Sequence, residues 1–190
     1  MKKIFALLLA TALLAAPAWG YDQEDLDKLK ATNTCKECDL TKADLREADL
    51  READLTKAYL IGANLYMANL EGADLSDTNL TVANLREADL RGANLERADL
   101  EGTNLYKANL QEANLEGADL READLRFAYL QEAKLRFANL FRANLIAAYL
   151  TGVTLGDTNQ PDAYLTWATL SPAIFCRTIM PERTIINDDC

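Results

Sequence analysis

The sequence predicts an all-β solenoid, in which the chain winds in short repeated coils around one elongated core. Every fifth residue from Leu40 to Leu155 is leucine, which makes 24 consecutive matches. Alanine usually stands two residues before the leucine, and aspartate or asparagine one residue before it. A period of five fits neither the 3.6-residue period of a helix nor the two-residue period of a strand. The leucines can share one core only if the backbone turns a corner once per repeat, as in a solenoid.

The composition excludes several classes of function. The 190 residues carry a formal net charge of −10 and include no histidine. Without histidine the chain lacks the commonest general base and metal ligand, so hydrolysis of the serine–histidine type is excluded. The negative charge argues against binding to nucleic-acid phosphates or to an anionic membrane surface. We therefore expect no enzyme activity, no cofactor and no nucleic-acid partner.

Residues 1–20 have the pattern of a secretory signal peptide. Two lysines precede an apolar run at residues 4–16, and the small residues that follow allow cleavage after Ala18 or after Gly20. A retained membrane anchor is the alternative, but the run is shorter than the ~20 residues that span a bilayer. The sequence thus predicts an exported protein that is not attached to a membrane after cleavage.

A helix is expected over residues 21–34, before the repeats begin. Asp22 can cap this helix, and Leu26 and Leu29 would share one of its faces. The helix would cover the open end of the first coil, which otherwise exposes apolar side chains and unpaired strand edges. A partner-binding helix is the alternative.

The repeats are expected to span residues 35–180 as roughly seven coils, about 35 Å of rod. Gln160 interrupts the leucine register, which resumes at Leu165 and then fades. Residues 181–190 are expected to form a C-terminal cap that packs its isoleucines inward.

The run Ala48-Asp49-Leu50-Arg51-Glu52 is typical of the chain and resembles the repeats of the pentapeptide repeat family. The resemblance covers about three quarters of the chain. It implies a right-handed quadrilateral β-helix in which four repeats form one square coil, with leucine and the preceding alanine inside. Residues 20 apart would then stack about 4.8 Å from each other.

The same resemblance implies two kinds of function. Exported members, which are abundant in cyanobacteria, suggest a non-enzymatic structural or interaction rod in the periplasm or thylakoid lumen. Other members are acidic rods that mimic DNA and protect or inhibit gyrase. The charge of this chain fits that alternative, but the expected export would separate it from gyrase.

Outward residues would form rows along the four faces of the rod. One row alternates guanidinium and aromatic groups, and we interpret it as a stabilising cation–π ladder; a groove for an anionic or planar ligand is the alternative. Stacked carboxylates such as Asp99 and Asp119 lack a clustered chelating geometry, so no metal site is predicted. The ladder consists of Arg46, Tyr66, Arg86, Tyr106 and Arg126.

Aromatic residues crowd the outward positions of the late coils. Exposed apolar groups of this kind mark interfaces, so they are the candidate surface for self-association or for an unknown protein partner. The alternative is that residues 171–190 fold back over part of them. The surface consists of Phe127, Tyr129, Phe137, Phe141 and Tyr149.

Four cysteines allow three pairings. We expect local pairing of Cys35 with Cys38 and of Cys176 with Cys190, which would staple the two ends of the rod. Pairing between the ends would need Cα atoms within about 7 Å, far less than the expected length of the rod. The C-x-x-C spacing also occurs in redox enzymes and zinc sites, so a thiol–disulfide activity of Cys35 and Cys38 is an alternative.

Overall fold

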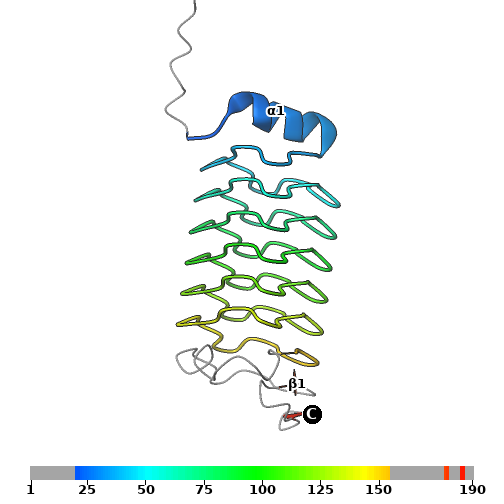
Figure 1. Ribbon diagram of the computed structural model, residues 1–190, viewed down its shortest axis with the longest axis vertical. Helices are drawn as coiled ribbons and strands as arrows, with labels where there is room; N and C mark the ends of the chain where they lie inside the picture. The colour runs from blue at the N-terminus through cyan, green and yellow to red at the C-terminus, as the bar shows by residue number, and fades with distance from the viewer. Residues whose placement is uncertain (1–19, 155–177, 180–184, 187–190) are drawn as a thin grey trace, which may run out of the picture.

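The structure is a computed structural model that describes residues 20–154, 178–179 and 185–186. The described chain forms a rod of stacked coils with a helix across its N-terminal end (Figure 1). Each coil takes 20 residues. The residue before each repeat leucine forms a parallel bridge with the residue 20 positions later. Residues 34–153 therefore make six complete coils. The expected signal peptide, apart from Gly20, lies outside the described residues, as does nearly all of the expected C-terminal cap.

Leucine and alanine fill the interior of the rod. Every repeat leucine from Leu40 to Leu150 is buried, and so are the alanines of the repeats except the half-buried Ala48. Thr78 and Thr103 replace alanine and are buried too, and each donates its hydroxyl to a leucine carbonyl 2.9 Å away. Those hydrogen bonds remove the cost of burying a hydroxyl. The inward assignment of both repeat positions is confirmed.

A hydrogen-bonded turn makes the corner of each repeat. The alanine N–H donates to the carbonyl of the leucine three residues earlier, as from Ala43 to Leu40 at 3.0 Å. The second residue after the leucine has positive φ at all 23 corners from Lys42 to Gly152. Six of these 23 residues are glycine, and the other 17 adopt a left-handed conformation that favours glycine. The chain therefore bends with ordinary residues, most of them charged.

The aspartate or asparagine before the leucine supports the corner. Its Oδ1 accepts the backbone N–H two residues later, as in the bonds from Thr41 to Asp39 and from Thr81 to Asn79, both 3.0 Å. This Asx turn needs one acceptor oxygen, which both side chains have. Aspartate and asparagine can therefore exchange at this position.

Few residues of the rod form continuous strand. Each repeat contributes one bridged residue between two corners, so the pairings are isolated parallel bridges. The named strands of the described residues are β1 (Thr178–Ile179) and β2 (Ile185–Ile186), which pair antiparallel. Their antiparallel direction differs from the parallel stacking of the coils.

Helix α1 (Gln23–Thr32) lies within the range 21–34 expected for a helix. Asp22 accepts the N–H of Glu24 at 2.8 Å, and Asn33 ends the helix in a left-handed conformation. Leu26 and Leu29 are buried in the same cluster as the repeat leucines, and α1 lies across the first coil (Figure 1). In the described part of the chain, no helix is long and apolar enough to cross a membrane.

Candidate functional site: the side-chain rows of the outer faces

Arginine pairs with the aspartate two residues before it wherever the sequence is Asp-Leu-Arg. The two residues flank a buried leucine and point outward from one face, so Nε and Nη2 meet both carboxylate oxygens. In the second of these pairs the distances are 2.8 and 2.6 Å. Such two-pronged contacts are the strongest geometry for this ion pair. The pairs are Asp44–Arg46, Asp49–Arg51, Asp89–Arg91, Asp119–Arg121 and Asp124–Arg126.

These arginines change the acidity of their partners. The hydrogen bond from Arg91 lowers the pKa of Asp89, and that from Arg126 lowers the pKa of Asp124, because each favours the charged carboxylate. The guanidinium also reduces the negative field of the faces on which these aspartates lie.

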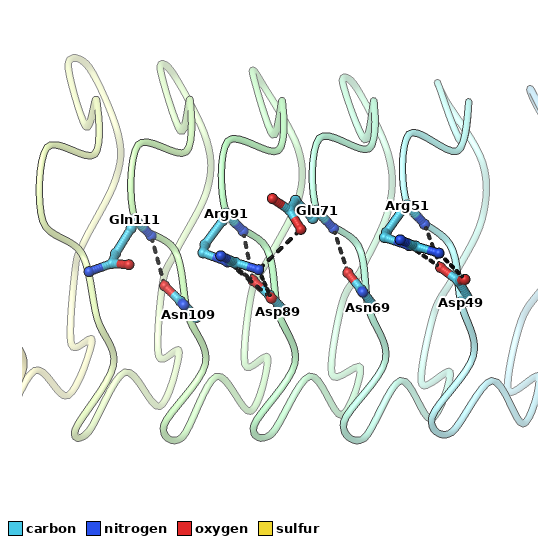
Figure 2. Close-up of polar contacts among 8 residues, drawn as sticks. All are labelled: Asp49, Arg51, Asn69, Glu71, Asp89, Arg91, Asn109 and Gln111. Atoms are coloured by element: carbon cyan, nitrogen blue, oxygen red, sulfur yellow. Dashed lines mark hydrogen bonds and ion pairs between the residues drawn. The ribbon is translucent and has the colours of Figure 1, made fainter.

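Figure 2 shows one row of outward residues, in which arginine can pair with the aspartate of its own repeat or with a glutamate of the neighbouring coil. Arg91 Nη2 lies 2.7 Å from Asp89 in its own repeat and 3.0 Å from Glu71 in the preceding coil. Among the described residues, the Arg51 guanidinium hydrogen-bonds to Asp49 alone, although Glu71 follows it in the same row. The alternating charges are therefore joined at one step of the row and not at the other.

The predicted cation–π ladder forms in its second half only. The guanidinium carbons of Arg86 and Arg126 lie 5.0 and 5.5 Å from the centre of the Tyr106 ring, one coil away on either side. Within residues 20–154 no cation lies over the Tyr66 ring: Arg46 pairs with Asp44, and Arg86 lies over Tyr106 instead. A ladder across five coils is thus corrected to one aromatic ring between two arginines.

The late-coil aromatic residues encircle the rod. They lie next to a core leucine or at the corner that follows one, and together they occupy all four faces. Phe127, Phe137 and Phe141 are exposed, while Tyr149 is half-buried. The exposed Tyr129 ring stacks on that of Tyr149 with centres 4.9 Å apart. We call the five residues predicted above, 127, 129, 137, 141 and 149, the aromatic belt.

Cys35 and Cys38 occupy core positions of the first repeat. Cys35 stands where later repeats have leucine and Cys38 where they have alanine, and both are buried. The structure places their Cα atoms 5.3 Å apart with the sulfurs bonded as a disulfide. Above them, the carbonyl of Asp25 lies 3.1 Å from Cys35 Sγ, and Lys28 Nζ lies 3.8 Å from Cys38 Sγ. The other two cysteines lie outside the described residues.

One group of stacked carboxylates comes closer than the sequence suggested. Oxygens of Asp99, Glu101 and Asp119 lie within 4.8 Å of one another. Arg121 donates to Asp119 at 2.7 and 2.8 Å and to Glu101 at 2.6 Å. The guanidinium thereby supplies the positive charge that these acidic groups require.

The five-residue repeats and 20-residue coils match a known protein family. A family model described as pentapeptide repeats matches in eight copies, at residues 38–77, 83–121 and 118–157. The chain belongs to the pentapeptide repeat family. Pentapeptide repeat proteins fold as right-handed quadrilateral β-helices and are generally non-enzymatic structural or interaction proteins.

Several solved structures of pentapeptide repeat proteins are similar to this chain. HetL of the cyanobacterium Nostoc sp. strain PCC 7120, involved in heterocyst differentiation regulation, is 36% identical over 80% of this chain and 78% of HetL, with a TM-score of 0.46. Rfr23 of the cyanobacterium Cyanothece 51142 is 28% identical over 77% of this chain and 97% of its own, with a TM-score of 0.51. The protein alr5209 of Nostoc PCC 7120 is 35% identical over 53% and 83%, with a TM-score of 0.45. A comparison with curated proteins gives no match.

Proposed function

We propose that this pentapeptide repeat protein is a non-enzymatic rod that presents its outer faces to a protein partner in an extracytoplasmic compartment. The observation that carries the proposal is the aromatic belt. Rings at positions 127, 129, 137 and 141 are each about 40% exposed, although the core is complete without them. Aromatic residues are enriched where proteins bind each other, because they bury a large area with few rotatable bonds.

The proposed compartment follows from the N-terminal sequence and from the first repeat. Residues 1–20 have a signal-peptide pattern, and a bonded Cys35–Cys38 pair would persist in an oxidising compartment such as the periplasm or thylakoid lumen. Pairing of Cys176 with Cys190 would close the other end in the same way. Both pairs act as staples in this proposal.

The two alternative functions have less support. A DNA mimic needs rows of unpaired negative charge, whereas arginine neutralises the aspartate of every Asp-Leu-Arg repeat. A thiol–disulfide enzyme needs an accessible thiolate, whereas Cys35 and Cys38 are buried beneath α1.

Mass spectrometry of the mature protein tests the compartment and the staples. Peptide mapping with and without reduction is expected to show an N-terminus near residue 19 or 21 and the pairs Cys35–Cys38 and Cys176–Cys190. An uncleaved chain with four free thiols would contradict export and favour the DNA-mimic alternative.

Cross-linking in the native compartment, with variants, tests the partner surface. The variant Phe127→Asn, Phe137→Asn, Phe141→Ser is expected to lose the cross-linked partner or the self-associated species of the wild type. Asparagine is used at 127 and 137 because it tolerates their positive φ. A control removes exposed apolar groups from early coils instead, at Tyr59, Met67 and Val82. If both variants keep the same partner, the aromatic belt is not the interface.

A further inference from the structure

The N-terminal end of the rod is covered only in part by α1. The helix segment contacts the first coil at Asp39 on one face and at Arg51 on another. Between these contacts, coil residues 44–46 and 48–52 and helix-end residues 29–33 line a groove of about 900 Å³. In Figure 1, α1 lies across this end of the rod.

Backbone groups along this groove lack the partners that their equivalents have one coil below. Asn64 donates its N–H to Ala43 at 2.9 Å, and its carbonyl accepts from Leu45 at 2.8 Å. Asp44 lies directly above Asn64, on the side of α1, and forms a parallel bridge with it. Within the described residues, the N–H and carbonyl of Asp44 itself have no hydrogen-bond partner. The same is true of Asp49. The groove thus contains an open edge of the parallel ladder.

The core is also slightly open along this edge. Leu45 and Leu50 are 4% and 5% exposed, whereas Leu65 and Leu70 in the next coil are fully buried. Ala48, at the corner between them, is half-buried. Two leucines five residues apart, with a small residue between, therefore meet the groove beside unpaired peptide groups.

The charges at the rim largely cancel. Arg46 is paired with Asp44 at 2.6 Å, and Arg51 is paired with Asp49 at 2.6 Å. An occupant consequently gains little from its own net charge. Hydrogen bonds to its main chain and packing of its apolar side chains are what the edge offers.

We propose that this edge binds an extended segment of a partner polypeptide, which adds to the rod as a further parallel strand and corner above residues 44–50. The chemistry of the segment follows from continuity with the stacking below: apolar side chains over Leu45 and Leu50, and a small one over Ala48. Addition of a strand to a sheet edge is a general mode of peptide recognition. The site gives the proposed interaction role a second surface, separate from the aromatic belt.

A peptide with the sequence of residues 63–70 is a suitable probe, because this segment stacks on residues 43–50 from below in the rod. Binding of the labelled peptide to the full chain is measured by fluorescence anisotropy. In the rod, leucine N–H groups donate to the coil below and asparagine N–H groups to the coil above. Methylation of both leucine amides is expected to weaken binding at least tenfold, and methylation of both asparagine amides less than twofold.

The position of the peptide is tested by amide exchange and by variants. Saturation with peptide is expected to slow exchange at Asp44 and Asp49 at least tenfold. Ala48→Arg would fill the corner and is expected to weaken binding at least tenfold, whereas Glu47→Arg, on the adjacent outward position, leaves it within twofold. If Ala48→Arg does not fold, the methylated peptides and the amide-exchange data still show whether the peptide binds at this edge.

Three results would overturn the proposal: no saturable binding, equal effects of the two methylation patterns, or protection elsewhere than at Asp44 and Asp49. A fourth is concentration-dependent protection of those two amides without peptide, which would assign the edge to a second copy of the chain. None of these results affects the test of the aromatic belt, so the two proposals fail independently.

Discussion

The backbone N–H of Cys38 donates to the carbonyl of Cys35 at 3.3 Å, the same hydrogen bond that alanine and leucine form at most later corners. The two cysteines are therefore the ends of an ordinary repeat turn. A four-residue turn brings its ends within 7 Å, which is the range a disulfide needs. The staple thus fits the first corner without altering its backbone.

Replacing both cysteines with the usual repeat residues is expected to preserve the rod. A disulfide that closes so short a loop contributes about 2 kcal/mol through the unfolded chain. Cys35→Leu with Cys38→Ala should recover part of this by apolar packing, whereas Cys35→Ser with Cys38→Ser loses the bond and buries two hydroxyls. Urea unfolding should rank the oxidised wild type first and the serine variant last. A leucine–alanine variant that is stable but loses partner binding would instead point to a thiol function.

Val82 is a β-branched residue at a left-handed corner. Its φ is 51°, its side chain is 59% exposed, and its Cγ1 lies 3.2 Å from where a Cβ on Gly102 would stand. A left-handed conformation costs an L-residue about 1–2 kcal/mol and is rarest for β-branched side chains. Val82→Asn is therefore expected to raise the free energy of unfolding by about 1 kcal/mol and Tm by roughly 2–4 °C.

The control for this corner is Val82→Thr, which keeps the branch at Cβ and should therefore change the free energy of unfolding little. Thermal unfolding followed by circular dichroism compares the three proteins. Equal Tm values for the asparagine and threonine variants would show that the backbone at residue 82 is not strained.

The coil was predictable from the sequence, but its corners were not. The five-residue spacing of leucine requires a regular corner, and the stacking of residues such as Asp54 on Asp74 then follows. The left-handed residue at each corner leaves little trace in the sequence, because 17 of 23 such residues are not glycine. The tight turn and Asx bond hold charged residues in this conformation.

The cation–π ladder predicted from the sequence is longer than the one in the structure, and the difference has a physical reason. A guanidinium can reach an aromatic ring one coil away or a carboxylate two residues back in its own repeat. Arg46 hydrogen-bonds to the carboxylate of Asp44 through two nitrogens. A charged two-pronged hydrogen bond of this kind is stronger than an exposed cation–π contact. Arg86 follows Asn84 rather than an aspartate, and it lies over Tyr106. The Asp-Leu-Arg sequence alone could not have separated these cases, because Arg126 pairs with Asp124 and also lies 5.5 Å from the centre of the Tyr106 ring.

Leu90→Lys is expected to prevent folding. Leu90 is fully buried in the middle of the rod and its N–H bonds to Asn109 in the next coil at 2.7 Å. An ammonium there would be unpaired in an apolar column, at a cost above about 4 kcal/mol. Leu90→Met should cost less than about 1.5 kcal/mol, since it nearly conserves volume.

A surface change beside this site provides the second control. Arg86→Ala removes a cation–π contact 5.0 Å from Tyr106 and should cost under about 1 kcal/mol. Circular dichroism and urea unfolding compare the variants. A Leu90→Lys protein with wild-type spectrum and melting would mean that leucine does not face the core.

Acid is expected to weaken the rod partly through two aspartates. Hydrogen bonds from Arg91 and Arg126 lower the pKa of Asp89 and Asp124 in the folded chain, below the ordinary value of about 3.9 that applies when it is unfolded. At low pH the unfolded chain therefore binds more protons than the folded chain, so the free energy of unfolding decreases as the pH is lowered. This contribution is fully present above about pH 5 and is lost as the pH falls through the folded pKa values.

Urea unfolding at pH 6 and pH 3 measures the size of this effect. Both pairs are partly exposed, so together they account for roughly 0.5–1 kcal/mol of the difference between the two pH values. Asp89→Asn with Asp124→Asn should reduce the difference by that amount, and so should Arg91→Gln with Arg126→Gln, because either change removes the pairing. Gln111→Ala, a neutral change in the row of Arg91, should leave it unaltered. If the aspartate variants keep the full wild-type difference, the acid sensitivity comes from other carboxylates and the Asp-Leu-Arg pairs are too well solvated to matter.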